Sequence, residues 1–195
     1  MTWKSYIAYG EKYEYEEHAT IFMQGERGKG FYYLDKGNII NRFLSINGKE
    51  RYMNHISPGM LFGEEGSNGS NYLSNAETLE PSSVYFFTEQ TLLDICQKDP
   101  DAVTIFIRHQ VESFRKKLQV IQLLDSNIES QMKLYLLHYA GESTEIPFNQ
   151  TRIADDLATS RVTVNKIVQK WQNQRLIKLE KQKIHLLDRD NFFSM

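Results

Sequence analysis

Two short amphipathic helices, separated by a tight polar turn, constrain this chain more than any other feature. The first is expected to begin after Asn149, a helix N-cap, and the second after Ser160, which ends the turn Ala158-Thr159-Ser160. The inner face of the first would hold Ile153, Ala154 and Leu157. The buried stripe of the second would hold Val164, Ile167, Val168 and Trp171. This spacing, with small Ala154 at the crossing, predicts a helix-turn-helix pair.

The outer face of the second helix is rich in hydrogen-bond donors. In a helix-turn-helix, the N-terminal part of this helix reaches the base edges in the major groove. Behind it, Leu176–Glu180 and Lys183–Leu187 alternate around a basic turn, which predicts a β-wing. A solvated helical hairpin would share the basic face, but not the core spacing and the wing. We therefore predict that double-stranded DNA is contacted by Asn149, Gln150, Ser160, Arg161, Val162, Thr163, Asn165, Lys166, Gln169 and Lys170.

The charge of the chain is unevenly distributed. From residue 145 to residue 195 there are nine Lys and Arg against six Asp and Glu, a net charge of +3. The remaining 144 residues carry 14 basic against 19 acidic side chains, a net charge of −5. A basic C-terminal part suits phosphate contact, because neutralised phosphates release counterions.

The first half of the chain reads as short strands with glycine turns. Strands are expected around Tyr13–Tyr15, Thr20–Met23, Phe31–Leu34, Tyr72–Leu79 and Ser83–Phe87. Asn38–Ile46 and Lys49–Ile56 flank Asn47-Gly48, a strong hairpin signal. Helices follow from Thr88 onward. The expected fold class is therefore α+β: an N-terminal antiparallel β-roll of the double-stranded β-helix or jelly-roll type, a long helix, and a C-terminal winged helix-turn-helix.

The long helix, which begins near Asp99-Pro100, carries a heptad stripe of Thr104, Ile107, Val111, Phe114, Leu118 and Ile121. This spacing favours a parallel helix pair across a two-fold axis, with Ile107, Val111, Phe114, Leu118 and Ile121 as the dimer interface. A helix packed on its own roll would show a similar stripe. Phe106, Val120 and Leu123 offer a second apolar face for the roll, which favours the dimer. The expected domains are residues 1–99 (sensing roll), 100–126 (dimerisation helix) and 127–195 (DNA binding).

In the order of these segments the chain resembles the CRP/FNR family of bacterial regulators. The resemblance covers about residues 11–187. It rests on Met23-Gln24-Gly25-Glu26, on Phe31 to Gly37, on Pro58 to Glu64, on Ile153-Ala154 and on Ser160 to Lys166. It implies a cyclic-nucleotide-type roll, a homodimer, a pseudo-palindromic operator and contact with RNA polymerase. Arg161, Val162, Asn165 and Lys166 match the positions that touch bases. Many members have Glu where Val162 stands, so the preferred half-site should differ. Arg161→Ala should relax sequence preference, whereas Lys170→Ala should weaken all DNA binding about equally.

The sensing half departs further from the family. Members that bind cyclic AMP hold its phosphate with an Arg-Ser/Thr pair after Gly-Glu, and a count from Gly63-Glu64 reaches Ser74-Asn75 instead. On the long helix the matching positions hold Phe114-Arg115, where Arg115 either captures an anion or is a solvated surface residue. Gly63, Glu64, Ser74, Asn75, Phe114 and Arg115 are thus the candidate effector pocket, and cyclic AMP is not the expected effector. A small, partly apolar or aromatic effector, or none, is expected.

Cofactors and other function classes find little support. The single Cys96 excludes a four-cysteine iron–sulfur cluster. His55 and His109 are candidate haem ligands, but lone histidines are more often structural, so no haem is expected. The five histidines are scattered, which disfavours a cupin-like metalloenzyme, and we expect no enzyme activity. A sensor that acts on a protein partner remains an alternative. With neither signal peptide nor apolar span, a cytoplasmic location without membrane contact is expected.

Overall fold

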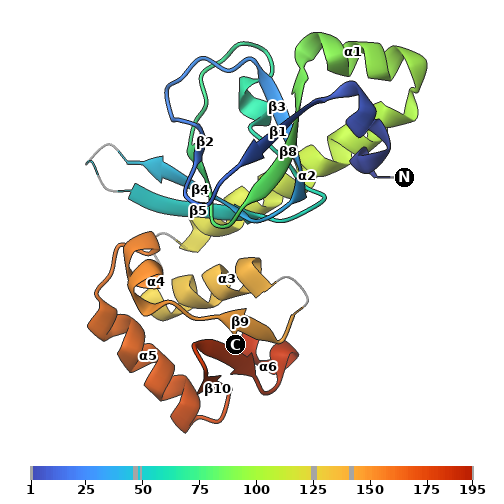
Figure 1. The fold of residues 1–195 in the computed structure, drawn as a ribbon. Coiled ribbons are helices and arrows are strands. Elements are labelled where there is room, and N and C mark those ends of the chain that lie inside the picture. Colours follow the sequence, from blue (N-terminus) through green and yellow to red (C-terminus); the bar gives the residue numbers. More distant parts are fainter. Residues whose placement is uncertain (1, 46–47, 49, 124–126, 141–142, 195) are drawn as a thin grey trace. The chain divides into compact units, whose positions relative to one another are not determined.

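The computed structural model describes residues 2–45, 48, 50–123, 127–140 and 143–194. The chain folds as two compact units that divide after Leu118, within helix α2 (Asp101–Leu123). Figure 1 shows both units, with most of their helices and strands labelled. This division lies inside α2 and does not test the three domains expected from the sequence, residues 1–99, 100–126 and 127–195. Those boundaries therefore remain predictions.

Two antiparallel sheets form the first unit (Figure 1). In one sheet the strand order is β1 (Glu11–Tyr15), β8 (Ser82–Thr88), β3 (Gly30–Lys36) and β6 (Leu61–Phe62). In the other it is β2 (Thr20–Phe22), β7 (Asn75–Thr78), β4 (Ile39–Leu44) and β5 (Glu50–Ile56). The antiparallel roll expected from the sequence is confirmed. Gly48 has φ 76°, as a hairpin turn after Asn47 requires, although Asn47 itself lies outside the described residues.

Alternate residues of β3 face two different cores. Leu34 packs with Val84, Ile39 and Ala76, so one core lies between the two sheets. Phe31 and Tyr33 point the other way, toward Trp3 of the 3-10 helix η1 (Trp3–Tyr9). The Trp3 ring lies 5.5 Å from the Phe31 ring and 5.6 Å from the ring of Phe106 on α2. Because successive side chains of β3 point to opposite faces of the sheet, this strand contacts both the interior of the roll and the helices outside it.

The helices of the first unit begin at the expected signals. Thr88 Oγ1 accepts from the Thr91 backbone N–H at 3.1 Å and caps α1 (Glu89–Lys98). Helix α2 follows Asp99-Pro100. A short 3-10 helix, η2 (Glu64–Gly66), follows Gly63, whose left-handed φ of 70° suits glycine.

The second unit is a winged helix-turn-helix. Its elements are α3 (Ile128–Ala140), β9 (Glu145–Pro147), α4 (Gln150–Asp156), α5 (Arg161–Asn173), β10 (Ile177–Glu180), β11 (Lys183–Leu186) and α6 (Arg189–Ser194). The sheet order is β10, β11, β9. Asn149 Oδ1 accepts from the Arg152 N–H at 3.1 Å, and Ser160 Oγ accepts from the Thr163 N–H at 3.0 Å, so both expected caps are present. The wing turns through Lys181 and Gln182, with left-handed φ values of 47° and 58°.

Candidate nucleic-acid interface

Helix α5 is held by a buried face against the rest of the second unit. Val164, Ile167, Val168 and Trp171 are buried, as are Ile153, Ala154 and Leu157 beneath them. The Trp171 ring meets the Phe192 ring edge-to-face with centroids 4.9 Å apart. The Tyr135 hydroxyl donates to Asp156 Oδ2 at 2.9 Å, so the one buried carboxylate of α4 is hydrogen-bonded.

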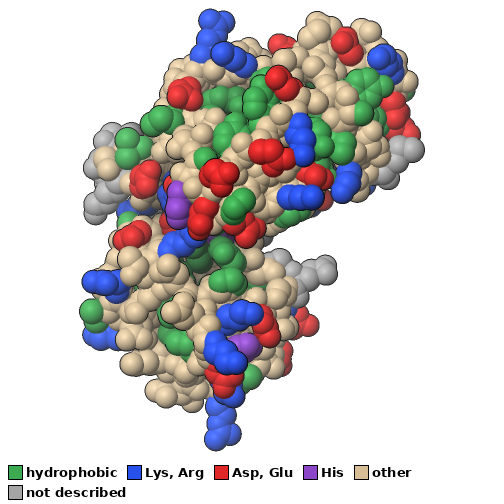
Figure 2. Space-filling view, in the orientation of Figure 1, with side chains coloured by type: hydrophobic (Ala, Val, Ile, Leu, Met, Phe, Trp, Pro, Cys, Tyr) green, Lys and Arg blue, Asp and Glu red, His purple; other side chains and the backbone are tan. Residues whose placement is uncertain are grey.

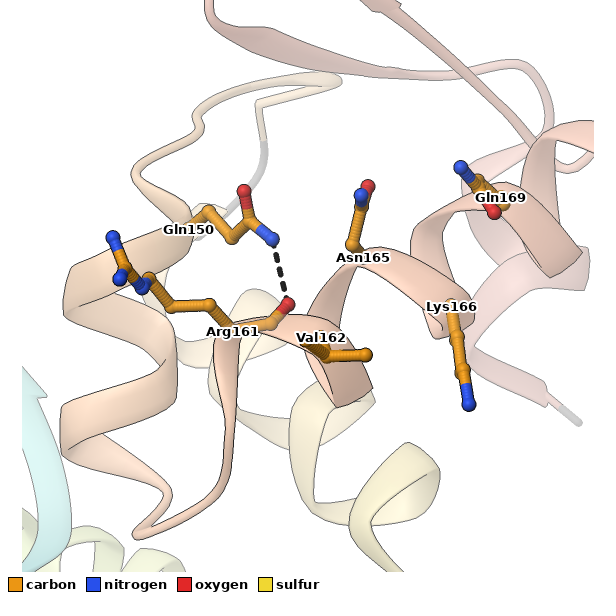
Figure 3. Close-up of a pocket in the computed structure, with 6 residues that line it drawn as sticks. All are labelled: Gln150, Arg161, Val162, Asn165, Lys166 and Gln169. Atoms are coloured by element: carbon orange, nitrogen blue, oxygen red, sulfur yellow. Dashed lines mark hydrogen bonds between the residues drawn. The ribbon is translucent and has the colours of Figure 1, made fainter.

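The opposite face of α5 is open to solvent. A shallow cavity of about 490 Å³ is lined by Gln150, Arg161, Val162, Asn165, Lys166 and Gln169, all six of which were expected to contact DNA. Figure 3 shows Asn165 and Gln169 pointing to the same side of α5, and Gln150 reaching across from α4. Gln150 Nε2 donates to the Arg161 carbonyl at 2.6 Å, which ties the first turn of α5 to α4. Val162 is 64% exposed, so its methyl groups are open to contact on this face.

The other expected DNA contacts make hydrogen bonds within the unit. Asn149 and Ser160 are the caps of α4 and α5, and the Ser160 and Thr163 hydroxyls lie 2.8 Å apart. Lys170 Nζ lies 2.7 Å from Glu129 Oε2. Asn149, Ser160, Thr163 and Lys170 therefore stabilise the helices of the candidate interface, in addition to being expected DNA contacts.

Glu129 is a residue that sequence reasoning missed, since nothing in the spacing of α3 links it to α5. Its Oε1 accepts from the Trp171 indole at 2.8 Å while Oε2 binds Lys170. Burial acts to raise the pKa of Glu129, but the hydrogen bonds from Lys170 and Trp171 outweigh it, so the pKa is lowered. The Glu129 carboxylate thus binds both the buried Trp171 and the exposed Lys170 of α5.

The candidate effector residues occupy different settings, Gly63, Glu64, Ser74 and Asn75 in the roll and Phe114 and Arg115 on α2. Ser74 is fully buried, and Asn75 Oδ1 accepts from the Gln24 backbone N–H at 2.7 Å. Glu64 is almost fully buried, and its Oε1 lies 3.8 Å from Lys117 Nζ on α2. Burial raises the pKa of Glu64, and Lys117 opposes that rise. Phe114 is 61% exposed, and Arg115 is also exposed.

The heptad stripe of α2 lies uncovered on the single chain. Ile107, Val111, Phe114 and Leu118 are between 39% and 61% exposed, whereas the side chain of Ile121 lies outside those described. The other side of the helix carries Ala102 and Ile105, both buried, and Phe106 against Trp3. Of the second apolar face expected from the sequence, Phe106 packs against the roll, whereas the side chains of Val120 and Leu123 lie outside those described. The four described stripe residues point away from this contact.

The distribution of charge, metal ligands and apolar helices adds three findings. On the face seen in Figure 2, acidic and basic side chains are interspersed over the first unit. Among the residues that the structure describes, no three His, Cys, Asp or Glu side chains cluster as a metal site would require. None of the helices in the described ranges combines the length and apolar character that a membrane crossing requires.

Comparison with known proteins gives the same two-part organisation. Residues 12–99 match the cyclic nucleotide-binding domain, and residues 131–192 match the Crp-like helix-turn-helix domain. The transcriptional regulator LdrP of Thermus thermophilus is 24% identical over 183 residues, with 87% of this chain and 88% of LdrP covered. The cAMP-activated global transcriptional regulator CRP of Pasteurella multocida is 22% identical over 187 residues, with 88% of each covered. The structure of FixK2 from Bradyrhizobium japonicum superposes with a TM-score of 0.79 at 17% identity, covering 95% and 96% of the two chains.

The roll, the exposed face of α5 and the wing together define a sensor-type domain coupled to a DNA-binding winged helix-turn-helix. With both family models matched in that order, this chain belongs to the CRP/FNR family of DNA-binding transcription regulators. The family consists of transcription regulators rather than enzymes.

Proposed function

We propose that this chain acts as a cytoplasmic homodimer that reads a pseudo-palindromic operator through α5. The observation that carries the proposal is the exposed face of Arg161, Val162 and Asn165 on a helix whose opposite side is buried. Such a helix can enter the major groove without losing its core contacts.

The side chains on this face suit distinct bases. The Arg161 guanidinium can donate to both O6 and N7 of guanine, and the Asn165 amide can pair with N6 and N7 of adenine. Val162 has only methyl groups to offer, so its natural contact is the C5-methyl of thymine. Lys166 and Gln169, one turn further along, extend the donor face toward the phosphates. A half-site containing guanine, thymine and adenine follows.

Dimerisation is proposed through the stripe on α2. Four exposed apolar residues at heptad spacing would lose their water contacts against the same stripe of a second copy. Two α5 helices related by a two-fold axis then match two half-sites about 34 Å apart. In this arrangement the bound dimer contacts RNA polymerase, and no membrane is involved.

Cyclic AMP is proposed not to be the effector. Ser74 brings no charge to the place where relatives hold the phosphate, and Asn75 already accepts from Gln24. Glu64 has a cationic partner in Lys117 at 3.8 Å. If another effector gates the dimer, it needs only to bind one arrangement of the α2 pair better than the other.

Fluorescence anisotropy with a randomised half-site library tests the DNA proposal. We expect wild-type binding to weaken as salt rises, Arg161→Ala to lose sequence preference, and Lys170→Ala to weaken all sequences about equally. Gln172→Ala, an exposed position on the same helix, is the control and should leave preference unchanged. Identical behaviour of the Arg161 and Lys170 variants would contradict the assignment. Absence of salt-sensitive duplex binding would favour a protein partner instead of DNA.

Calorimetry with millimolar cyclic AMP tests the effector proposal. We expect no binding heat and no change in operator affinity. Stoichiometric binding of cyclic AMP would show that the proposal is wrong.

A further inference from the structure

A second cavity lies at one edge of the β-roll, between β1 and β2. Strand β1 is the last strand of one sheet and β2 the last of the other, so neither has a strand beyond it on that side. The cavity has a volume of about 280 Å³. It contains none of the residues assigned above to DNA or to the candidate effector pocket.

Aromatic rings form the walls of this cavity. Tyr32 and Phe86 are direct neighbours on β3 and β8, with ring centroids 5.0 Å apart. Tyr13 and Tyr15 extend along β1, with centroids 6.5 Å apart. Phe22, stacked on Tyr72 at 4.0 Å, closes the inner side. Rings on opposing sheets offer stacked and edge contacts to a flat aromatic guest.

Two cations stand at the rim. Arg27 and Lys29 are exposed, and within the described part of the chain neither has an ion-pair partner. Glu26 also lines the cavity, and its carboxylate, whose Oε2 accepts from the Met23 backbone N–H at 3.0 Å, sets one negative charge against the two positive charges of Arg27 and Lys29. The Tyr15 hydroxyl is protonated at neutral pH and is a further donor, and burial raises its pKa further above the ordinary value of 10.0. The rim therefore favours an anionic group.

Backbone hydrogen bonds hold this rim in place. The Gly25 N–H donates to the Tyr72 carbonyl at 2.9 Å, and the Tyr72 N–H donates to the Glu26 carbonyl at 2.9 Å. The Gly28 N–H donates to the Ser70 carbonyl at 2.9 Å, and Arg27 forms a β-bridge with Asn71. The cations are thus carried by a fixed loop, which lowers the entropy lost when a ligand binds.

We propose that this cavity binds a small planar aromatic carboxylate. The ring lies between Tyr15 and Phe86, and the carboxylate meets Arg27 and Lys29. The volume of about 280 Å³ lies just below the usual range for ligand sites, about 300–1,000 Å³, so a single ring or a fused pair fits better than a nucleotide. The regulatory meaning of this site rests on the proposed function, but the binding itself requires no DNA.

The position of Phe86 links the cavity to α2. Its neighbour Phe87 points to the other face of β8, where its ring stacks on Phe31 at 5.3 Å. Phe31 in turn meets Phe106 of α2 with centroids 5.2 Å apart. A ligand that presses on Phe86 therefore acts on the strand that supports the dimerisation helix.

The test compares acids with their neutral amides on the full chain without DNA. Benzoate and 2-naphthoate are titrated against benzamide and 2-naphthamide by calorimetry and by NMR of ¹³C-labelled Tyr and Phe rings. We expect at least one acid to bind at least tenfold more tightly than its amide and to shift the Tyr15 and Phe86 resonances. Arg27→Gln and Lys29→Gln should each weaken the acid at least fivefold. Lys12→Gln is the matched control, because Lys12 lies on β1 beside Tyr13 but pairs with Glu14 at 2.6 Å outside the cavity.

Each outcome decides the proposal. Acid binding that is lost in both rim variants and kept in Lys12→Gln supports it. Equal affinity for acid and amide overturns the role of the rim cations, and absence of ring shifts with all four compounds overturns the site. Because DNA is measured separately, a chain that binds operator but neither acid would refute this site and leave the regulator intact.

Discussion

At the N-terminal end of α5, Val162 differs in chemistry from every residue beside it. Arg161, Asn165 and Lys166 donate hydrogen bonds, whereas Val162 presents only methyl groups at 64% exposure. A side chain of this kind discriminates between bases through contact with a methyl group rather than through a hydrogen bond. In the proposed complex, the choice of base opposite this position therefore depends on one residue.

Val162→Glu should change that choice. A carboxylate accepts from cytosine N4, so preference should move from thymine toward cytosine at one position of each half-site, by about 1–3 kcal/mol. Selection from a randomised operator library measures the shift. Asn173→Glu, which adds the same charge at the other end of α5, is the control and should lower affinity without changing base preference.

Glu129 is the second residue whose effect can be isolated. Glu129→Ala removes the hydrogen bonds to Trp171 and Lys170, and it should destabilise the second unit by about 1 kcal/mol at neutral pH. Because the folded pKa of Glu129 is lowered, its stabilisation is full above the ordinary value of 4.5 and is lost as pH falls through the lowered pKa. The difference in free energy of unfolding between the wild type and Glu129→Ala should therefore disappear at acidic pH.

Trp171 fluorescence in a Trp3→Phe background reports this unfolding, since the chain has two tryptophans. Asp155→Ala, an exposed position on α4, serves as control. If the difference in free energy of unfolding between the wild type and Glu129→Ala stayed unchanged as the pH fell well below 4.5, the charged Glu129 carboxylate could not be the cause of that difference.

At the scale of the element, helix N-caps and apolar stripes in the sequence were sufficient to predict where several helices begin and which side they bury. Thr88, Asn149 and Ser160 each cap the helix that was expected to follow, because a side-chain cap acts within three residues of its own position. The core of the helix-turn-helix was predicted for the same reason, from one stripe per helix.

The missed elements depend on distant partners. β9 is three residues long and exists through pairing with β11, and η1 is fixed by the Trp3 contacts with Phe31 and Phe87. The Glu129 contacts in the candidate interface were missed for the same reason, because Trp171 is 42 residues away along the chain. No short window of sequence contains both partners of such contacts.

The stripe on α2 yields a prediction for a whole element. Ile107→Asn should shift the monomer–dimer equilibrium at least tenfold toward monomer, because a polar side chain would be buried in the proposed seam. Sedimentation velocity measures the shift. Arg108→Asn, exposed on the adjacent position of the same helix, should leave the equilibrium unchanged. A monomeric wild-type chain at micromolar concentration would contradict the seam.

For the whole molecule, the two-fold symmetry of the proposed dimer would set the geometry of the operator. Two α5 helices on one face of the duplex require half-sites one helical turn apart. Inserting about five base pairs between half-sites turns one half-site to the opposite face and should reduce affinity to that of a single half-site. Inserting about ten base pairs returns both half-sites to the same face of the duplex. Part of the lost affinity should then be recovered, provided that the connection between the two units of each chain can span the longer distance. Footprinting and anisotropy on these spacer variants check the symmetry; equal affinity at every spacing would exclude it.

The left-handed turn at Lys181 and Gln182 has a consequence for evolution of the wing. Both residues adopt φ values that Asn-Gly tolerates better, so folding alone favours Asn-Gly at this tip. Lys181→Asn with Gln182→Gly should stabilise the hairpin by about 1 kcal/mol. Because the pair of substitutions also removes the Lys181 cation from a wing that would lie near the phosphates of the proposed complex, we expect the salt dependence of binding to fall by about one ion. Stability and affinity would then move in opposite directions. A wing of this kind is a place where selection for binding works against selection for rigidity.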